Sequence, residues 1–126
     1  MQPSQIVIVE DNRLLQEALA DHLREQGFSV QALSDGKGLD ALLLAQPIDL
    51  LILDLNLPHD DGGSIAMRVR KTHADLAIVI LSARLPVQPA LALMQSVDLL
   101  MPKPVLPQEL TAAAHRLCAL AQNRRR

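Results

Sequence analysis

Five polar side chains follow aliphatic runs of the sequence, in positions from which they could do chemistry together. They are Glu10, Asp11, Asp54, Ser82 and Lys103. Carboxylates that lie close together repel one another, which raises their pKa values, and a bound divalent cation relieves this repulsion. Ligation by a few protein oxygens suits Mg²⁺, which keeps several waters and works beside phosphate. In such a site a carboxylate can attack phosphorus and form an acyl phosphate, while an ammonium and a hydroxyl contact the transferred group.

Each of these residues also has an ordinary structural explanation. An acid at the end of a strand commonly caps the helix that follows, and acids such as Glu10 and Asp11 favour a helix N-terminus. Ser82 taken alone would cap a turn, and Lys103 taken alone would be a solvated surface residue. The full set stands at the ends of four separate runs, so independent capping would require a coincidence. The chemical interpretation is therefore favoured.

The aliphatic runs themselves predict the strands of a buried sheet. They span residues 6–9, 29–33, 50–53, 77–81 and 97–101. Short runs of this kind without polar alternation are typical of strands covered on both faces. Stretches of helical spacing separate them, so the order β-α repeats five times and predicts parallel strands joined by right-handed crossovers. We therefore expect an α/β fold: a doubly wound, five-stranded parallel sheet of the flavodoxin-like (βα)5 type with strand order 2-1-3-4-5. Such sheets bind ligands at the carboxyl ends of their strands, where the polar set stands.

Capping and breaking residues predict some of the helix boundaries. Asn12 is a suitable N-cap for the first helix, and Ser34-Asp35 for the second. The fourth helix is expected to be short and to cover residues 90–95, since Pro86 and Pro89 interrupt its start.

Composition limits the classes of protein to which the chain can belong. Its 126 residues are 49% hydrophobic and 21% charged, with a formal net charge of −2, which suits one globular domain and offers no basic excess for gripping nucleic acid. The single cysteine, Cys118, excludes an intramolecular disulfide and is expected to be a buried small hydrophobe. No apolar run reaches the roughly 18 residues of a membrane span, and the polar N-terminus is unlike a signal peptide, so a cytoplasmic setting is expected. We expect residues 1–122 to form the domain and residues 123–126 to be a basic tail or the start of a linker.

At the polar positions the sequence resembles the receiver domain of two-component response regulators. The resemblance extends from Gln5 to about Leu120, and four segments carry it in the family's order and spacing: residues 6–12 (IVIVEDN), 50–62 (LLILDLNLPHDDG), 80–84 (ILSAR) and 101–104 (MPKP). It implies a phosphoacceptor signalling domain that catalyses only its own phosphorylation and dephosphorylation. It also implies Mg²⁺ as the cofactor and a sensor histidine kinase or a phosphotransfer protein as the donor.

The resemblance gives each matching residue a role. Asp54 would be the phosphoacceptor. The metal would be held by Glu10, Asp11, Asp54 and the main-chain carbonyl of Asn56. Ser82, Ala83 and Lys103 would contact the phosphoryl group, and Pro104 would follow a cis peptide bond. Residues 59–61 (HDD) are interpreted as a turn beside the acceptor rather than as a second metal site.

The sequence departs from the family on the surface through which receivers signal, formed by the fourth helix, the fifth strand and the fifth helix. Leu100 stands three residues before Lys103, where the family has a switching aromatic, so the aromatic side chain is missing while Ser82 is kept. Leu100 could change rotamer in its place or be an ordinary core residue. The charged pairs that join many receivers are also incomplete. We therefore expect a homodimer through this surface to pack apolar side chains, with Leu99 and Met101 as candidates if they are exposed.

Two other functions stay open from the sequence. An Mg²⁺-dependent phosphatase-type enzyme on a related fold would use the same residues, and a receiver-like interaction domain would take no phosphate. For the receiver interpretation, the chain is either a stand-alone receiver or part of a longer regulator, and we favour the second. The receiver would then control an output domain or a partner, with transcription as the expected output. The receiver itself would then contact no DNA, which would be bound only by a C-terminal output domain.

Overall fold

Five short aliphatic strands form a parallel sheet in the computed structural model of the chain, which describes residues 2–84 and 91–126. The strands are β1 (Gln5–Val9), β2 (Ser29–Leu33), β3 (Leu50–Asp54), β4 (Ala77–Ser82) and β5 (Leu99–Pro102). Their order across the sheet is β2-β1-β3-β4-β5, and every neighbouring pair is parallel. The predicted fold class and strand order are confirmed.

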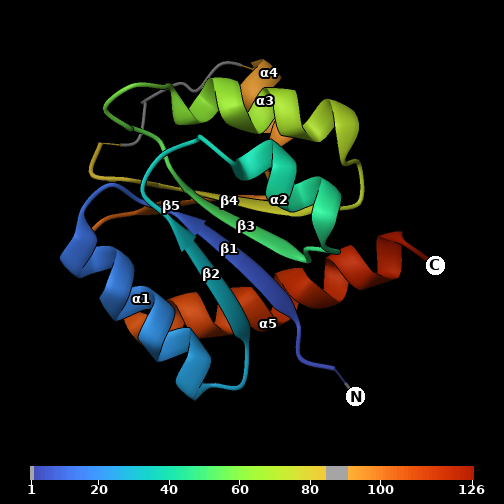
Figure 1. Ribbon diagram of the computed structural model, residues 1–126, viewed down its shortest axis with the longest axis horizontal. Coiled ribbons are helices and arrows are strands. Elements are labelled where there is room, and N and C mark those ends of the chain that lie inside the picture. The colour runs from blue at the N-terminus through green and yellow to red at the C-terminus, as the bar shows by residue number, and fades with distance from the viewer. Residues whose placement is uncertain (1, 85–90) are drawn as a thin grey trace.

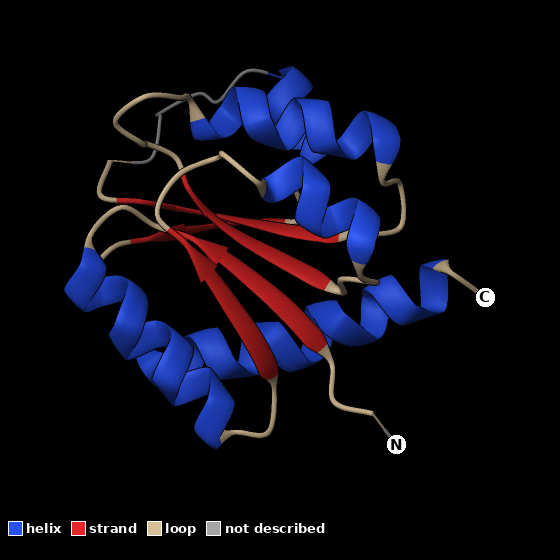
Figure 2. Cartoon of the chain, viewed as in Figure 1, coloured by secondary structure: helices blue, strands red, loops and turns tan. Residues whose placement is uncertain are grey.

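Helices cover both faces of this sheet, as Figure 1 and Figure 2 show. They are α1 (Arg13–Glu25), α2 (Leu39–Ala45), α3 (Gly62–Thr72), α4 (Leu91–Ser96) and α5 (Pro107–Arg124). α1 and α5 lie on one face, while α2, α3 and α4 lie on the other. The three central strands β1, β3 and β4 therefore bury both of their faces, which explains their almost continuously aliphatic sequences, whereas the edge strands β2 and β5 are mostly half-buried.

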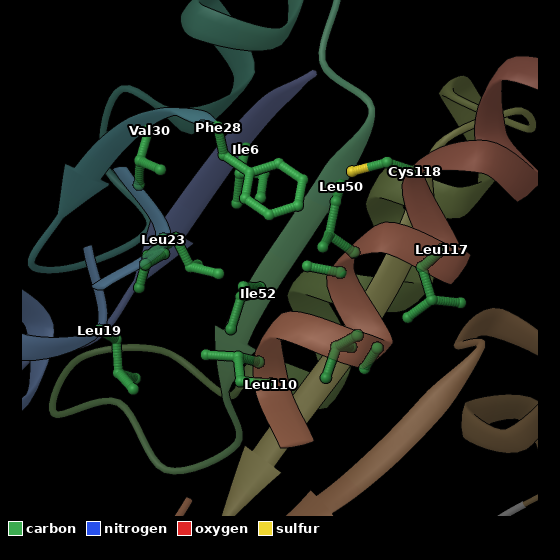
Figure 3. Close-up of a cluster of buried hydrophobic side chains, with 14 of the residues drawn as sticks. Ile6, Leu19, Leu23, Phe28, Val30, Leu50, Ile52, Leu110, Leu117 and Cys118 are labelled. Atoms are coloured by element: carbon green, nitrogen blue, oxygen red, sulfur yellow. The ribbon is translucent and has the colours of Figure 1, made fainter. Parts of the chain in front are cut away.

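Alternate residues of each central strand supply two separate cores. Ile6 and Ile8 of β1 pack beneath α1 and α5, whereas Val7 and Val9 pack beneath α2, α3 and α4. Figure 3 shows side chains of the first core, among them Ile6, Leu23, Phe28, Leu110 and Cys118. Cys118 is buried as predicted, and burial raises the pKa of its thiol to about 12. None of the helices in the described part of the chain is long and apolar enough to cross a membrane.

The caps of the first two helices differ from one another. The Asn12 side chain accepts a hydrogen bond from the Leu15 amide at 3.1 Å, which confirms the predicted cap of α1. The prediction for Ser34-Asp35 is wrong, because the Asp35 side chain closes a turn on the Lys37 amide at 2.8 Å. α2 begins after Gly38, whose φ of 79° lies in the left-handed region.

The segment around α4 and β5 differs in detail from the prediction. α4 has six residues and is short, as expected. The part of the prediction that concerns residues 85–90, including both prolines, lies outside the described residues. Met101, a candidate for the dimer contact only if exposed, is buried in the core beneath α1 and α5 and is therefore a packing residue. Leu99 is half-buried and packs against the same core, because β5 turns this side toward α5.

A cluster of ion pairs joins several elements at the edge where the strands begin. The Asp98 carboxylate, with a side chain 12% exposed, accepts hydrogen bonds from Arg124 at 2.6 Å, Arg70 at 2.9 Å and the Ile78 amide at 2.9 Å. Burial alone would raise the pKa of Asp98. The hydrogen bonds from Arg124 and Ile78, together with the charges of both arginines, outweigh burial and hold this pKa below its usual value.

This lowered pKa predicts a loss of stability in acid that depends on Asp98. Because the folded-state pKa lies below the unfolded value, the ion pairs contribute fully above about pH 4, and the contribution disappears as the pH falls through the folded-state pKa. Asp98→Asn should lower the free energy of unfolding by about 2 kcal/mol at pH 7. In urea titrations the difference from wild type should shrink steadily below about pH 4.

The control for this experiment is Asp21→Asn. Asp21 pairs with Arg24 at 3.2 Å on an exposed part of α1, so the substitution should change the free energy of unfolding by less than about 0.5 kcal/mol. If Asp98→Asn lowered the free energy of unfolding equally at pH 7 and below about pH 4, the assigned ion pairs would be contradicted.

Candidate functional site

Three carboxylates converge at the edge where the strands end. Glu10 and Asp11 follow β1, and Asp54 ends β3, the neighbouring parallel strand in which Leu53 pairs with Val9. One oxygen from each carboxylate lies within 4.8 Å of the others. Glu10 is 1% exposed and Asp54 4% exposed, whereas Asp11 is exposed to solvent. The parallel sheet therefore brings together the acids that stand 43 residues apart in the sequence, from residue 11 to residue 54.

Lys103 brings a positive charge between the two buried acids. Its Nζ lies 2.6 Å from Glu10 Oε1 and 3.4 Å from Asp54 Oδ2. The lysine follows β5, where its amide donates to the Ser82 carbonyl at 2.8 Å. Its peptide bond to Pro104 is cis, which confirms the isomer expected from the sequence. The ammonium is thus held at the carboxylates by both its main chain and its ion pairs.

The pKa shifts at the site follow from burial and from these charges. Burial raises the pKa of the Glu10 carboxyl, and the nearby Asp54 raises it further, while Lys103 offsets part of the rise. Burial alone would lower the pKa of Lys103, but its hydrogen bond to Glu10 and the charges of Glu10 and Asp54 outweigh burial and raise it. Lys103 is therefore a permanent cation at neutral pH. One ammonium is shared by two buried carboxylates.

Main-chain groups fix the carboxylates in place. The Asn56 amide donates to Asp54 Oδ1 at 3.1 Å, and the Asn12 amide donates to Glu10 Oε2 at 3.2 Å. The buried side chain of Gln16 donates to the Glu10 carbonyl at 3.0 Å. Gln16 is not among the site residues predicted from the sequence, although a polar residue on the apolar side of a helix is a recognisable sign of a buried hydrogen bond.

Ser82 lies at the end of β4, beside Asp54, but its hydroxyl contacts its own loop. Ser82 Oγ donates to the Arg84 carbonyl at 2.8 Å and accepts from the Arg84 amide at 3.1 Å. Ala83 is exposed at the same edge. Leu100 is half-buried against the core beneath α2, α3 and α4. Glu10, Asp11, Asp54 and Lys103 are therefore gathered in space, while Ser82 stands next to them with its hydroxyl bonded elsewhere.

The loop after β3 folds back tightly on the acceptor strand. Asp61 caps α3 by accepting from the Gly63 amide at 3.1 Å, which gives it a structural role in the turn. The Gly62 amide donates to the Leu55 carbonyl at 2.9 Å. A Cβ atom at Gly62 would lie 2.2 Å from the Asp54 carbonyl oxygen and 2.8 Å from the Leu55 Cα. Only glycine fits there.

The chemistry of this donor set fits Mg²⁺. Glu10, Asp11 and Asp54 offer carboxylate oxygens from a small region, and one lysine leaves their negative charge only partly neutralised. Mg²⁺ prefers oxygen ligands and is commonly held by one or two carboxylates together with water and phosphate. The exposed Asp11 places the set at the surface, where a cation and a phosphoryl group can approach.

Comparison with known proteins gives a consistent match. The family model described as the response regulator receiver domain matches residues 6–115. The response regulator MprA of Mycolicibacterium vanbaalenii is 34% identical over 116 residues, which cover 91% of this chain and 50% of MprA. The transcriptional regulatory protein PmrA of Pectobacterium parmentieri is 40% identical over 79 residues, covering 63% of this chain and 36% of PmrA. The chain thus spans half or less of the length of these curated relatives.

A solved structure agrees with the sequence matches. The response regulator TrrA of Thermotoga maritima, in complex with Mg²⁺ and BeF, superposes with a TM-score of 0.82 at 25% identity. The alignment covers 90% of this chain and 98% of the TrrA chain.

The close approach at Gly62 predicts that the acceptor loop tolerates no side chain there. Gly62→Ala should lower the free energy of unfolding by about 3 kcal/mol, since the new methyl group meets main-chain atoms that cannot move away cheaply. Gly63→Ala is the matched control, because its Cβ would meet only side-chain atoms, at 3.5 Å or more. It should be neutral or slightly stabilising in the same helix turn. Equal stability of the two variants in urea titrations would contradict the close approach.

Proposed function

This chain belongs to the response regulator receiver domain family, and on that premise we propose that Asp54 is its phosphoacceptor and that Mg²⁺ is required for the transfer. The domain signals rather than converting a separate substrate. One observation carries the proposal: the carboxylates of Glu10, Asp11 and Asp54 meet at one strand edge with Lys103 between the two buried acids.

We assign the metal ligands to Glu10, Asp11, Asp54 and the main-chain carbonyl of Asn56. Glu10 would act directly or through water. Bound there, Mg²⁺ would neutralise the remaining negative charge and share the charge of the phosphoryl oxygens. The Asn56 amide already orients Asp54 by binding its Oδ1 at 3.1 Å.

In the proposed transfer, a carboxylate oxygen of Asp54 attacks the phosphorus of a phosphohistidine. The oxygen–phosphorus bond forms as the phosphorus–nitrogen bond breaks, and the electron pair of that bond returns to the imidazole of the donor. Lys103, the side chain that already contacts Asp54, would neutralise the transferred group. Ser82 and the Ala83 amide would donate hydrogen bonds to it. Ser82 must first release Arg84, so the transfer would move the loop after β4.

The donor in this proposal is a sensor histidine kinase or a phosphotransfer protein, in the cytoplasm. We propose that residues 1–122 are the receiver and that residues 123–126 begin a linker to an output domain. α5 extends through Arg124, so the linker would start as the last turn of this helix. The names of the relatives, which include a transcriptional regulatory protein of more than twice the matched length, support transcription as the output. DNA would be bound by the output domain alone.

We propose that the aliphatic Leu100 takes part in the switch in place of an aromatic. Its half-buried side chain packs beneath α4 on the same core as Leu93 and Val97. When the loop after β4 moves, Leu100 can change rotamer and alter how α4 packs.

Phosphorylation itself provides the decisive test. Incubation with Mg²⁺ and acetyl phosphate, or with beryllofluoride, should label wild type stoichiometrically, as read by intact mass or by ¹⁹F spectroscopy. Asp54→Asn should lose the label while keeping its fold. Asp60→Asn, which makes the same change at an exposed acid of the same loop, should keep it.

Two results would overturn this function. Repeated turnover of added phosphate esters would identify a phosphatase-type enzyme. A chain that bound neither Mg²⁺ nor the phosphoryl analogue would be an interaction domain that takes no phosphate.

We also propose that the phosphorylated domain forms a homodimer through α4, β5 and α5. Leu91 and Met94 on α4 are 68% and 53% exposed, and Leu120 on α5 is 36% exposed, which gives this face apolar contact residues. With Mg²⁺ and beryllofluoride, Met94→Ser should weaken dimerisation about tenfold in sedimentation equilibrium. Leu44→Ser, at an 82% exposed leucine of α2, should leave dimerisation unchanged. A wild type that stays monomeric, or equal weakening by both variants, would contradict this interface.

A further inference from the structure

The last turn of α5 is fastened to the sheet by two arginines with different partners. Arg124 binds Asp98, with Nη2 and Oδ1 2.6 Å apart. Arg125 binds Asp49, which precedes β3 and is itself held by the Gln5 amide at 2.8 Å. The side chains of the described C-terminal arginines 124 and 125 are therefore folded onto the domain.

Asp98 lies in the α4–β5 segment (residues 91–101), and its carboxylate binds arginines of both α5 and α3. Arg70 of α3 donates to the same carboxylate at 2.9 Å and also to the Ser96 carbonyl, the last residue of α4, at 2.8 Å. Asp98 also accepts from the Ile78 amide of β4. A continuous chain of charge-assisted hydrogen bonds thus runs from the end of α4 through Arg70 and Asp98 to Arg124.

Asp98 also lies at the protein surface, where it lines hollows open to solvent. It lines two hollows, one with Met94 and Leu100 and the other with Arg116 and Leu120. These hollows adjoin on the α4, β5 and α5 face. Asp49 lies at the same strand edge but lines neither of them.

We propose that Asp98 couples the α4–β5 segment to the last turn of α5. Local opening of either segment then lowers the hydrogen-exchange protection of the other. Both arginines bind one carboxylate, which connects the two segments, and thermodynamic linkage makes any such coupling reciprocal. Its mechanical consequence, control of the direction in which the chain leaves α5, rests on the proposed linker role of residues 123–126. Arg125 fastens the same turn without taking part in the coupling, since its partner is Asp49.

Hydrogen exchange with mass spectrometry tests the coupling on the whole chain without any phosphoryl donor. Arg124→Gln should lower the protection of residues 120–126 and also of residues 91–101, each by about threefold to tenfold. Arg70→Gln should lower protection of both segments in the same way. Arg125→Gln is the matched control, and it should affect residues 120–126 alone. Protection of β3 serves as the reference for any change in global stability.

The outcomes separate coupling from simple fraying of the helix end. If Arg124→Gln loosens residues 120–126 and leaves residues 91–101 at wild-type protection, Asp98 carries no coupling. The same conclusion follows if Arg124→Gln and Arg125→Gln give identical exchange patterns.

A second measurement links the coupling to the switch. Mg²⁺ and beryllofluoride should change the protection of residues 120–126 in wild type and leave it unchanged in Arg124→Gln. An equal change in both would overturn the coupling. If beryllofluoride does not bind, the proposed function fails, while the exchange of the arginine variants still decides the coupling.

Discussion

The site depends on an imbalance of charge, because the two carboxylates of Glu10 and Asp54 have only one cation, Lys103, to pair with. Both carboxylates are almost completely buried, yet they share a single ammonium, which lies 2.6 Å from one and 3.4 Å from the other. Buried charges are costly unless they are paired, so an arrangement with two acids and one base favours the arrival of another cation. The parallel sheet creates this situation because the two acids stand at the ends of adjacent strands and the lysine arrives from β5. The fold therefore places an uncompensated negative charge, which fits a divalent cation, at the proposed phosphoacceptor.

The rest of the edge serves to keep this unfavourable arrangement fixed. Amides of Asn12 and Asn56 bind the carboxylates, and Gln16 holds the main chain of Glu10. Gly62 lets the loop after β3 approach the Asp54 carbonyl more closely than any side chain would allow. In contrast, the Ser82 hydroxyl is bound to the Arg84 main chain. Among these contacts, the one at Ser82 is the contact that a transferred phosphoryl group would have to replace.

The sequence predicted the parts of this structure that depend on local pattern. Aliphatic runs located the strands, and the acids that follow them identified the edge at which they meet, because a parallel sheet places all strand ends of one kind together. Features that depend on distant partners were not predictable. The arginines at the end of α5 appear as a free basic tail in the sequence, but Arg124 and Arg125 find acids that precede β5 and β3. Ser34-Asp35 failed as a cap because the Asp35 side chain closes a turn on the Lys37 amide, and the helix begins only after Gly38.

The two edges of the sheet shift the pKa of an acid in opposite directions, downward at Asp98 and upward at Glu10. Asp98 receives two guanidinium groups and an amide, so the pKa of its carboxyl is lowered despite burial. Glu10 competes with Asp54 for one ammonium, so burial prevails and the pKa of its carboxyl is raised. The edge where the strands begin is therefore electrostatically satisfied and holds α3, β4 and α5 together. The edge where they end retains unneutralised negative charge, and it is there that binding a cation relieves repulsion. A single sheet can thus combine an edge where Asp98 is fully paired with an edge where Glu10 and Asp54 are not, because the number of cations that reach each acid differs.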